Sequence, residues 1–370
     1  MTILHTIPGF ERLGHVADEA EYFRRRYGGG LDCWPNALGQ GLPAIQPGFG
    51  IGTPGWVFTE SDLHGSSEAD MLRTFLLMHL RKGGPDDTSN PDWNAVQNTA
   101  AYFLRTNTGP DQFYRGSAAY VADGYAGIRR SANGPFLGDH MYGPGLLDYW
   151  RYTGLQAAFD EAVMLGNEVQ TYWDTPTPIT TDPQDYFGLV GYLGRGPTRH
   201  LELVCELWRA TWGTPAEAQW AALADRMAAV YTGTSAPGWD EALGVYYSSR
   251  RVDVPEQPYY VSSIHLSLMG AALALYSKLT SNAAQREEAR RRVIRMADFA
   301  STYALHPTYG CGAYQYWINY PTTATPVYYY PLELELRADT HYAPRFLGIL
   351  ADAYDFTGSR AYLTAAEAIV

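Results

Sequence analysis

A repeated helix-end signature most strongly limits how this chain can fold. In each copy, apolar residues at helical spacing lead to an aromatic residue and then a threonine. The four copies span residues 146–154, 203–213, 272–281 and 349–359. Three of them have a glycine close behind the threonine, and glycine commonly ends helices in the left-handed conformation. Because a second helical run follows each copy, the pattern predicts a chain built from helical hairpins.

The second helix of each predicted hairpin is more polar than the first. These second runs span residues 155–169, 215–231, 283–300 and 360–370. Residues 71–84 and 91–107 form a fifth, more divergent copy, and residues 15–28 would supply part of a sixth. We expect the first helices to lie inside and the second helices outside.

The spacing of the hairpins favours a ring over a flat solenoid. TPR and HEAT repeats have periods of only ~34–47 residues, and the hairpins here are farther apart. We therefore expect an all-α fold, an (α/α)5–6 toroid with little β structure, as one domain over residues 1–370. Residues 1–55 would form an amino-terminal extension that covers the cleft.

Composition excludes several kinds of partner. The chain has 370 residues and a formal net charge of −12, without a Lys/Arg-rich run, which argues against nucleic acid. No apolar run reaches the ~18 residues of a membrane helix, and the first residues do not have the pattern of a signal peptide. We therefore expect a soluble protein, secreted or periplasmic if a leader was removed, of undetermined oligomeric state.

Histidines recur near the predicted start of each inner helix. Five of the nine histidines fall there: His64, His140, His200, His265 and His341. In a ring, these helix starts converge on one end of the central axis. A shared structural residue is the alternative explanation, but five histidines in register with reactive neighbours favour a common functional cleft.

The candidate site residues are drawn from these helix starts and their loops. The catalytic candidates are Asp139, His140, Tyr142, His200 and Tyr260. The substrate-binding candidates are His64, Glu68, Arg199, Glu202, His265, Trp317, Arg337, Asp339, His341 and Tyr342. No HxH or HExxH spacing is present, so we expect no metal and no cofactor, and no spacing indicates a divalent cation such as Ca²⁺.

Two long segments are rich in glycine, proline and aromatic residues. Residues 308–331 contain eight Tyr or Trp residues, and residues 32–56 have a similar composition. Both are too polar and too interrupted by proline for core strands, so we interpret them as long loops over one end of the ring. Aromatic rings suit the apolar faces of sugars, although packing across the end of the barrel would explain the loops equally well.

One of the copies is similar to a known signature. Residues 138–154, GDHMYGPGLLDYWRYTG, resemble the H-x-W/Y-x-x-G-L-L-x-Y-Y-x-x-T-G signature of bacterial carbohydrate-active (α/α)-toroid enzymes, and residues 340–359 resemble it more weakly. The rhamnogalacturonan exolyase-like toroid is closest in character, and six-hairpin glycosidases are also similar. The resemblance implies a toroid from about residue 56 onward that acts on a polysaccharide or oligosaccharide.

The preferred chemistry is that of a polysaccharide lyase. β-Elimination at a uronic acid needs a cation that neutralises the carboxylate, a base and an acid. The fork of an arginine suits the first role, and histidine or tyrosine suits the others. The assignments are His140 or His200 as base, Tyr142 or Tyr260 as acid, and Arg199 or Arg337 as neutralising cation.

Other activities stay open from the sequence. A glycoside hydrolase needs two carboxyl groups at a set separation, and the candidates pair Asp139 with Glu68, Glu202, Glu335 or Asp339. The negative net charge favours this reaction because it repels a polyanionic substrate at long range. A non-catalytic glycan-binding protein and a sugar epimerase on the same toroid are further alternatives.

Overall fold

The computed structural model describes most of the predicted helices. The described residues are 70–87, 89–90, 93–94, 96–97, 100, 104, 143–174, 195–234, 236, 238–250, 259–305, 315–318, 327–329 and 346–369. They fall into two compact units. The amino-terminal unit is the described part of residues 70–174, and the carboxy-terminal unit is the described part from residue 195 onward. Two segments singled out in the sequence, 15–28 and 32–56, lie outside the described residues.

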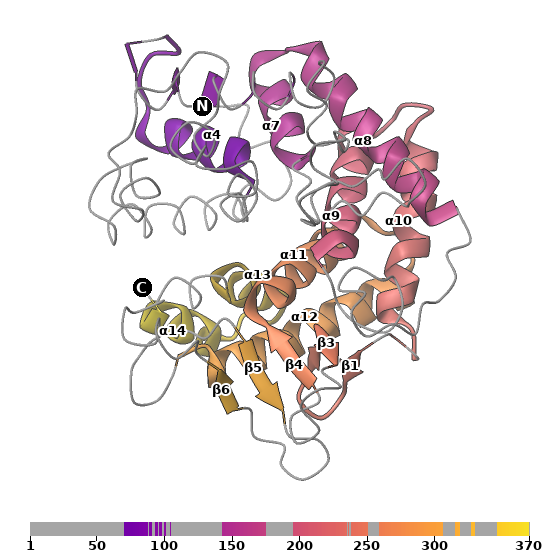
Figure 1. Ribbon diagram of the computed structural model, residues 1–370, viewed down its shortest axis with the longest axis vertical. Helices are drawn as coiled ribbons and strands as arrows, with labels where there is room; N and C mark the ends of the chain where they lie inside the picture. The colour runs from indigo at the N-terminus through magenta and orange to yellow at the C-terminus, as the bar shows by residue number, and fades with distance from the viewer. Residues whose placement is uncertain are drawn as a thin grey trace, which may run out of the picture. The chain divides into compact units, whose positions relative to one another are not determined.

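Helices make up most of both units (Figure 1). The amino-terminal unit contains α4 (Met71–Lys82), α7 (Gly143–Thr153) and α8 (Gln156–Asp174). The carboxy-terminal unit contains α9 (Arg195–Ala210), α10 (Glu217–Thr232), α11 (Ser263–Leu279), α12 (Ala283–Tyr303), α13 (Leu347–Thr357) and α14 (Arg360–Ile369). The predicted hairpins are therefore confirmed at α7–α8, α9–α10, α11–α12 and α13–α14. Closure into one ring over residues 1–370 stays a prediction.

The predicted helix-end signature is confirmed, and it has a structural role. Gly154 and Gly358 adopt φ of 74° and 68°, the left-handed conformation that lets the chain leave α7 and α13. Thr357 Oγ1 donates to the carbonyl of Ala353 at 2.7 Å and accepts the N–H of Ser359 at 3.1 Å. The hydroxyl thus closes the last helical turn and fixes the start of the connection.

Helices of successive hairpins run parallel in the carboxy-terminal unit. The Tyr276 hydroxyl lies 2.6 Å from Asp225 of α10 and 2.5 Å from Gln285 of α12, so these two positions are neighbours. About two turns later in both helices, Arg292 of α12 donates to the carbonyl of Gly233, directly after α10, at 2.9 Å. Since both helices advance in the same direction, α10 and α12 are parallel. A tight turn joins α9 to α10 and another joins α11 to α12, so each first helix runs opposite to its second helix. Helices α9 and α11, which pack against each other, are therefore parallel as well.

The amino-terminal unit repeats this parallel arrangement. Arg73 Nε of α4 lies 2.7 Å from Asp148 Oδ2 of α7. Before this pair in both segments, Asp70 accepts the N–H of Gly145, and after it Asp86 accepts the hydroxyl of Tyr152. The contacts advance together along both chains, so α4 and α7 lie side by side in the same direction. They are the first helices of successive hairpins, as the repeat predicts.

The first helices are more buried than the second, as expected. Thirteen of the residues of α11 are buried, among them Leu266, Met269 and Leu273. Its partner α12 has exposed charged residues, such as Glu287 and Arg291. The core of the carboxy-terminal unit therefore lies between α9, α11 and α13.

Two small antiparallel sheets accompany the helices. In the first, β1 (Trp239–Asp240) pairs with β2 (Val245–Tyr246). In the second, β3 (Ser249–Arg250), β4 (Tyr259–Ser262), β5 (Gln315–Ile318) and β6 (Val327–Tyr329) follow one another in that order. The four-stranded sheet corrects the expectation that residues 308–331 are only loop. Pro321 and Pro326 fall between β5 and β6, so they do not interrupt either strand, and the strand residues are mostly aromatic or β-branched.

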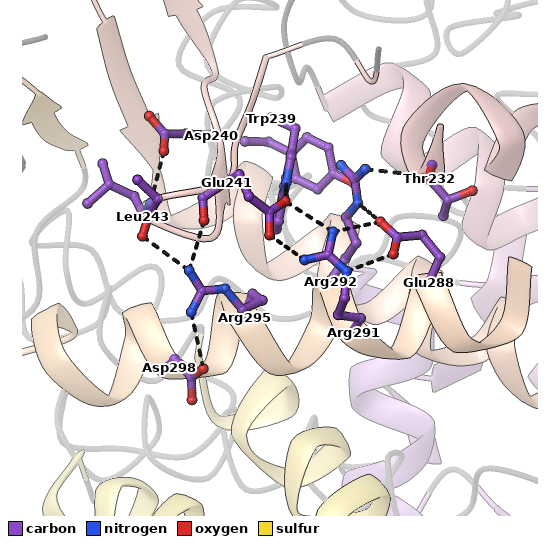
Figure 2. A network of polar contacts seen from close by, with 12 residues as sticks. Thr232, Trp239, Asp240, Glu241, Leu243, Glu288, Arg291, Arg292, Arg295 and Asp298 are labelled. Carbon is purple, nitrogen blue, oxygen red and sulfur yellow. Dashed lines mark hydrogen bonds and ion pairs between the residues drawn. The ribbon is translucent and has the colours of Figure 1, made fainter. Parts of the chain in front are cut away.

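The β1–β2 hairpin is fastened to α12 (Figure 2). Arg292 lies over the ring of Trp239, 4.3 Å from its centroid, and Arg291 Nη1 lies 2.5 Å from Glu241 Oε1. Arg295 donates to the backbone carbonyl of Glu241 at 2.8 Å. The pairing with Arg291 lowers the pKa of Glu241 to about 2. This network holds the chain that leads into β3 and β4.

No helix in the described ranges is both long and apolar enough to cross a membrane.

Candidate functional site

The candidate site lies at the amino-terminal ends of α9 and α11. Four predicted site residues have described side chains there: Arg199, His200 and Glu202 in α9, and His265 in α11. Because the two helices are parallel neighbours, their first turns lie at the same end of the pair. This is the arrangement expected for two of the five recurring histidines.

These residues differ in how far they reach solvent. His200 is completely buried, Arg199 is 4% exposed, and His265 is 7% exposed. Glu202 is partly exposed, one turn after Thr198, which is also buried. The second turn of α9 and the first turn of α11 thus carry a guanidinium and two imidazoles that are buried, and a partly exposed carboxylate follows in α9.

The local sequence explains why α9 presents these groups. Pro197 falls in the first turn, where the missing N–H removes no helical hydrogen bond. Leu203, Val204 and Leu207 are fully buried and fix the helix against its neighbours. Cys205 belongs to this buried set.

Two further predicted residues are brought together by the sheet. Tyr260 of β4 and Trp317 of β5 are register partners in the antiparallel ladder. Residues paired in this way share a face of the sheet. Strand β4 runs directly into α11, so the Tyr260–Trp317 pair lies a few residues from His265 along the chain. Neither residue could be paired from the sequence, because β5 was not expected.

Buried serines at the same junction were missed by sequence reasoning. Ser248, Ser262 and Ser263 are 3%, 1% and 0% exposed. The backbone N–H of Ser262 donates to Ser248 Oγ at 2.8 Å, which ties β4 to the residue before β3. The dipeptide Ser262–Ser263 ahead of an apolar helical run is a helix-start signal that would have drawn attention to this point.

A second polar centre joins α4 and α7. Asp70 accepts the N–H of Arg73 at 3.1 Å and that of Gly145 at 2.6 Å. Burial raises the pKa of Asp70 to about 7, although the charge of Arg73 opposes the shift. Asp148 binds both Arg73 and Arg151 at 2.7 Å. Sequence reasoning did not include these residues, and their partners lie within the unit, so we interpret the centre as structural.

A third polar cluster surrounds His79 at the end of α4. Its Nε2 lies 2.7 Å from Asp86 and its Nδ1 lies 3.2 Å from Asn90. Asp86 also accepts the hydroxyl of Tyr152 at 2.9 Å, and burial followed by this bond raises the pKa of Tyr152 to about 12. His79 is 2% exposed, and its ring packs against that of Trp93 in a tilted arrangement, with centroids 5.0 Å apart. Because both ring nitrogens are engaged, the cluster fastens α4 to α7.

The remaining predicted site residues lie outside the described part of the chain. They are His64, Glu68, Asp139, His140, Tyr142, Arg337, Asp339, His341 and Tyr342. Their proposed roles stay predictions. Among the described residues, no group of three or more His, Cys, Asp or Glu side chains is arranged to hold a metal ion.

No protein-family model matches the chain, and no curated protein is significantly similar to it. Among solved structures, the chain is similar to cellobiose 2-epimerase from Bacillus thermoamylovorans B4167. The identity is 15%, the match covers 82% of this chain and 74% of the other, and the TM-score is 0.48. A likeness this weak carries no argument about function.

Proposed function

We propose that this chain is a carbohydrate-active enzyme that cleaves a polysaccharide or oligosaccharide by β-elimination at a uronic acid residue. One observation supports this most directly. Because α9 and α11 pack in parallel, the second turn of α9, with Arg199, His200 and Glu202, and the first turn of α11, with His265, belong to the same end of the pair. These are the residue types that an elimination needs.

Arg199 suits the first requirement of the reaction. Removing the C5 proton of a uronate builds negative charge on the adjacent carboxylate, and a guanidinium can bind that group with two parallel hydrogen bonds. Arg199 is 4% exposed, so its charge acts in a poorly screened setting. Its role would be to make the proton more acidic.

A histidine suits the second requirement. A base must come within ~2.6–3.2 Å of the proton that it removes. His265 keeps a small exposed fraction, whereas His200 has none. We therefore assign the base to His265 among the described histidines, and we give His200 a positioning role. Tyr260, next to α11 in β4, is the proposed acid for the leaving oxygen.

Hydrolysis of a neutral glycan is the second candidate function. The formal net charge of −12 favours it, because a polyanionic chain is repelled at long range. Glu202 is the described carboxylate at the site, and its partner would come from Asp139, Glu68, Glu335 or Asp339. Hydrolysis makes reducing ends without a double bond, so one assay separates the two reactions.

The test is an incubation of the full chain with pectic, glucuronan, alginate-type and neutral polysaccharides. Ultraviolet absorbance of the unsaturated uronate and the release of reducing ends are followed together. Elimination predicts both signals on an acidic polysaccharide and a loss of both in His265→Gln. Glu287→Gln, on the exposed face of α12, is the matched control that should keep activity. Reducing ends without absorbance would replace elimination with hydrolysis.

A further inference from the structure

The helix α11 begins without a capping side chain. Its N-cap residue, Ser262, is extended (φ −91°, ψ 129°), and its hydroxyl makes no hydrogen bond to the first turn. Serine is one of the residues preferred for such a bond. Two other helices of the chain use theirs: Asp70 caps α4 and Asn282 caps α12 through side-chain acceptors. Helices α10 and α13 also begin without such a bond, but their N-cap residues, Ala216 and Phe346, have no side-chain acceptor, whereas Ser262 has one that it does not use.

The hydroxyl of Ser262 is also buried. The residue is 1% exposed, and its Oγ has no hydrogen-bond partner among the described residues. Its backbone N–H is satisfied by Ser248 Oγ. Buried polar groups are nearly always hydrogen-bonded, because burying one without a partner costs stability. A hydroxyl kept in this state at a helix start points to a ligand.

The charge of the helix end indicates what kind of ligand fits. The first turn of α11 contains no acidic residue, so nothing within it neutralises the positive end of the helix dipole. Helix amino termini bind anions readily. His265, the proposed base, lies in the same turn and would stand close to an anion bound there. A carboxylate is an anion that a hydroxyl donor and a helix amino terminus hold well together.

We infer that the first turn of α11, with Ser262 Oγ as a donor, is the subsite for the carboxylate of the uronic acid residue. This inference rests on the proposed function. The subsite would act together with Arg199 of α9. Arg199 supplies positive charge and the start of α11 supplies hydrogen-bond donors, and both stabilise the negative charge that builds on the substrate carboxylate. Ser262 is thus a specificity-determining residue that favours acidic over neutral sugars.

Stability and binding separate this role from a structural one. A serine that serves the fold loses stability when its hydroxyl is removed. A serine whose hydroxyl is held for a ligand keeps or gains stability and loses binding. Ser277 is the matched control: it lies in the same helix, is 2% exposed, and donates to the carbonyl of Ala274 at 2.8 Å.

The experiment uses the full chain with Ser262→Ala and Ser277→Ala. Thermal unfolding without ligand comes first, followed by calorimetric binding of trigalacturonate and of its methyl ester. We expect Ser262→Ala to unfold at or above the temperature of the unmodified chain and Ser277→Ala below it. Ser262→Ala should bind trigalacturonate at least tenfold more weakly and the ester with little change, while Ser277→Ala binds both like the unmodified chain.

Two results would overturn the inference while the proposed function stands. One is a loss of stability in Ser262→Ala as large as that in Ser277→Ala. The other is an equal loss of binding for the acid and the ester. If the unmodified chain binds neither oligosaccharide but acts on a neutral glycan, the uronate function itself fails, and the carboxylate subsite fails with it.

Discussion

Asp70 and Gly145 join the starts of two helices through one carboxylate. Oδ1 of Asp70 accepts the N–H of Arg73 in α4 at 3.1 Å, and Oδ2 accepts the N–H of Gly145 in α7 at 2.6 Å. A β-carbon at position 145 would overlap Asp70 Oδ1. This contact explains why residue 145, in the first turn of α7, is a glycine. The glycine is required by a neighbouring helix and not by its own backbone angles.

The first prediction concerns Gly145→Ala. The new methyl group has to displace a carboxylate that holds two helix starts, so we expect a loss of about 1–3 kcal/mol of unfolding free energy. Urea unfolding followed by circular dichroism measures it. Gly348→Ala is the matched control, since a β-carbon there meets nothing within 4 Å. It should be neutral or stabilise by up to about 1 kcal/mol, and equal losses in both variants would contradict the account.

The second prediction concerns the pH dependence that Asp70 gives to the fold. Its pKa rises from 3.8 to about 7 in the folded chain, with burial as the largest cause. The folded state therefore holds this proton more tightly than the unfolded chain does. The resulting stabilisation is complete below about pH 4 and is lost as the pH rises to about 7.

Asp70→Asn isolates this contribution, because the amide does not titrate. Thermal unfolding of both proteins between pH 4 and pH 8 gives the difference in melting temperature. We expect the unmodified chain to lose stability relative to the variant as the pH rises through this range. A relative gain would mean that the two N–H donors outweigh burial and hold the carboxyl ionised.

The third prediction concerns Arg292, the most buried arginine of the network that holds the β1–β2 hairpin (Figure 2). It binds Glu288 at 2.7 Å and the carbonyl of Gly233 at 2.9 Å. Arg292→Met removes the buried guanidinium from both acceptors, while Glu288 keeps its bonds from Arg291 and the Gly233 carbonyl keeps the N–H of Ala236, so we expect a loss of about 1–2 kcal/mol. Chemical denaturation measures it, and the exposed change Glu287→Gln should stay within about 0.5 kcal/mol.

The fourth prediction concerns the threonine of the helix-end signature. Thr357→Val removes one hydrogen bond within α13 and one to the following turn, so a loss of about 1 kcal/mol is expected. Thr302 donates to the carbonyl of Asp298 on an exposed face of α12. Thr302→Val should have a smaller effect in the same thermal unfolding experiment. If the two variants lose equal stability, Thr357 has no special role at the helix end, and only the helix propensity of threonine and valine matters.

The helices were predictable because their signals are local. The hydroxyl of Thr357 bonds within its own turn, and Gly358 ends the helix through its own backbone angles. Such chemistry is written into a few consecutive residues, so the helix boundaries could be expected from the sequence. The same reasoning placed His200 and His265 near the starts of successive inner helices, where α9 and α11 have them.

The long-range features were not predictable from local patterns. Asp70 and Gly145 are 75 residues apart, and nothing near Asp70 announces its second partner. Strand β5 needs β4 to satisfy its backbone, so residues 315–318 read as a loop when taken alone. The unused hydroxyl of Ser262 becomes visible only when burial and hydrogen bonds are known.

The most direct test of the account is the product formed from an acidic polysaccharide by the full chain and by Arg199→Met. The account predicts unsaturated uronate at the new non-reducing ends from the unmodified chain, detected by ultraviolet absorbance and mass spectrometry. It also predicts a loss of at least a hundredfold in Arg199→Met at unchanged folded content. Cleavage without a double bond, or elimination that does not depend on Arg199, would contradict it.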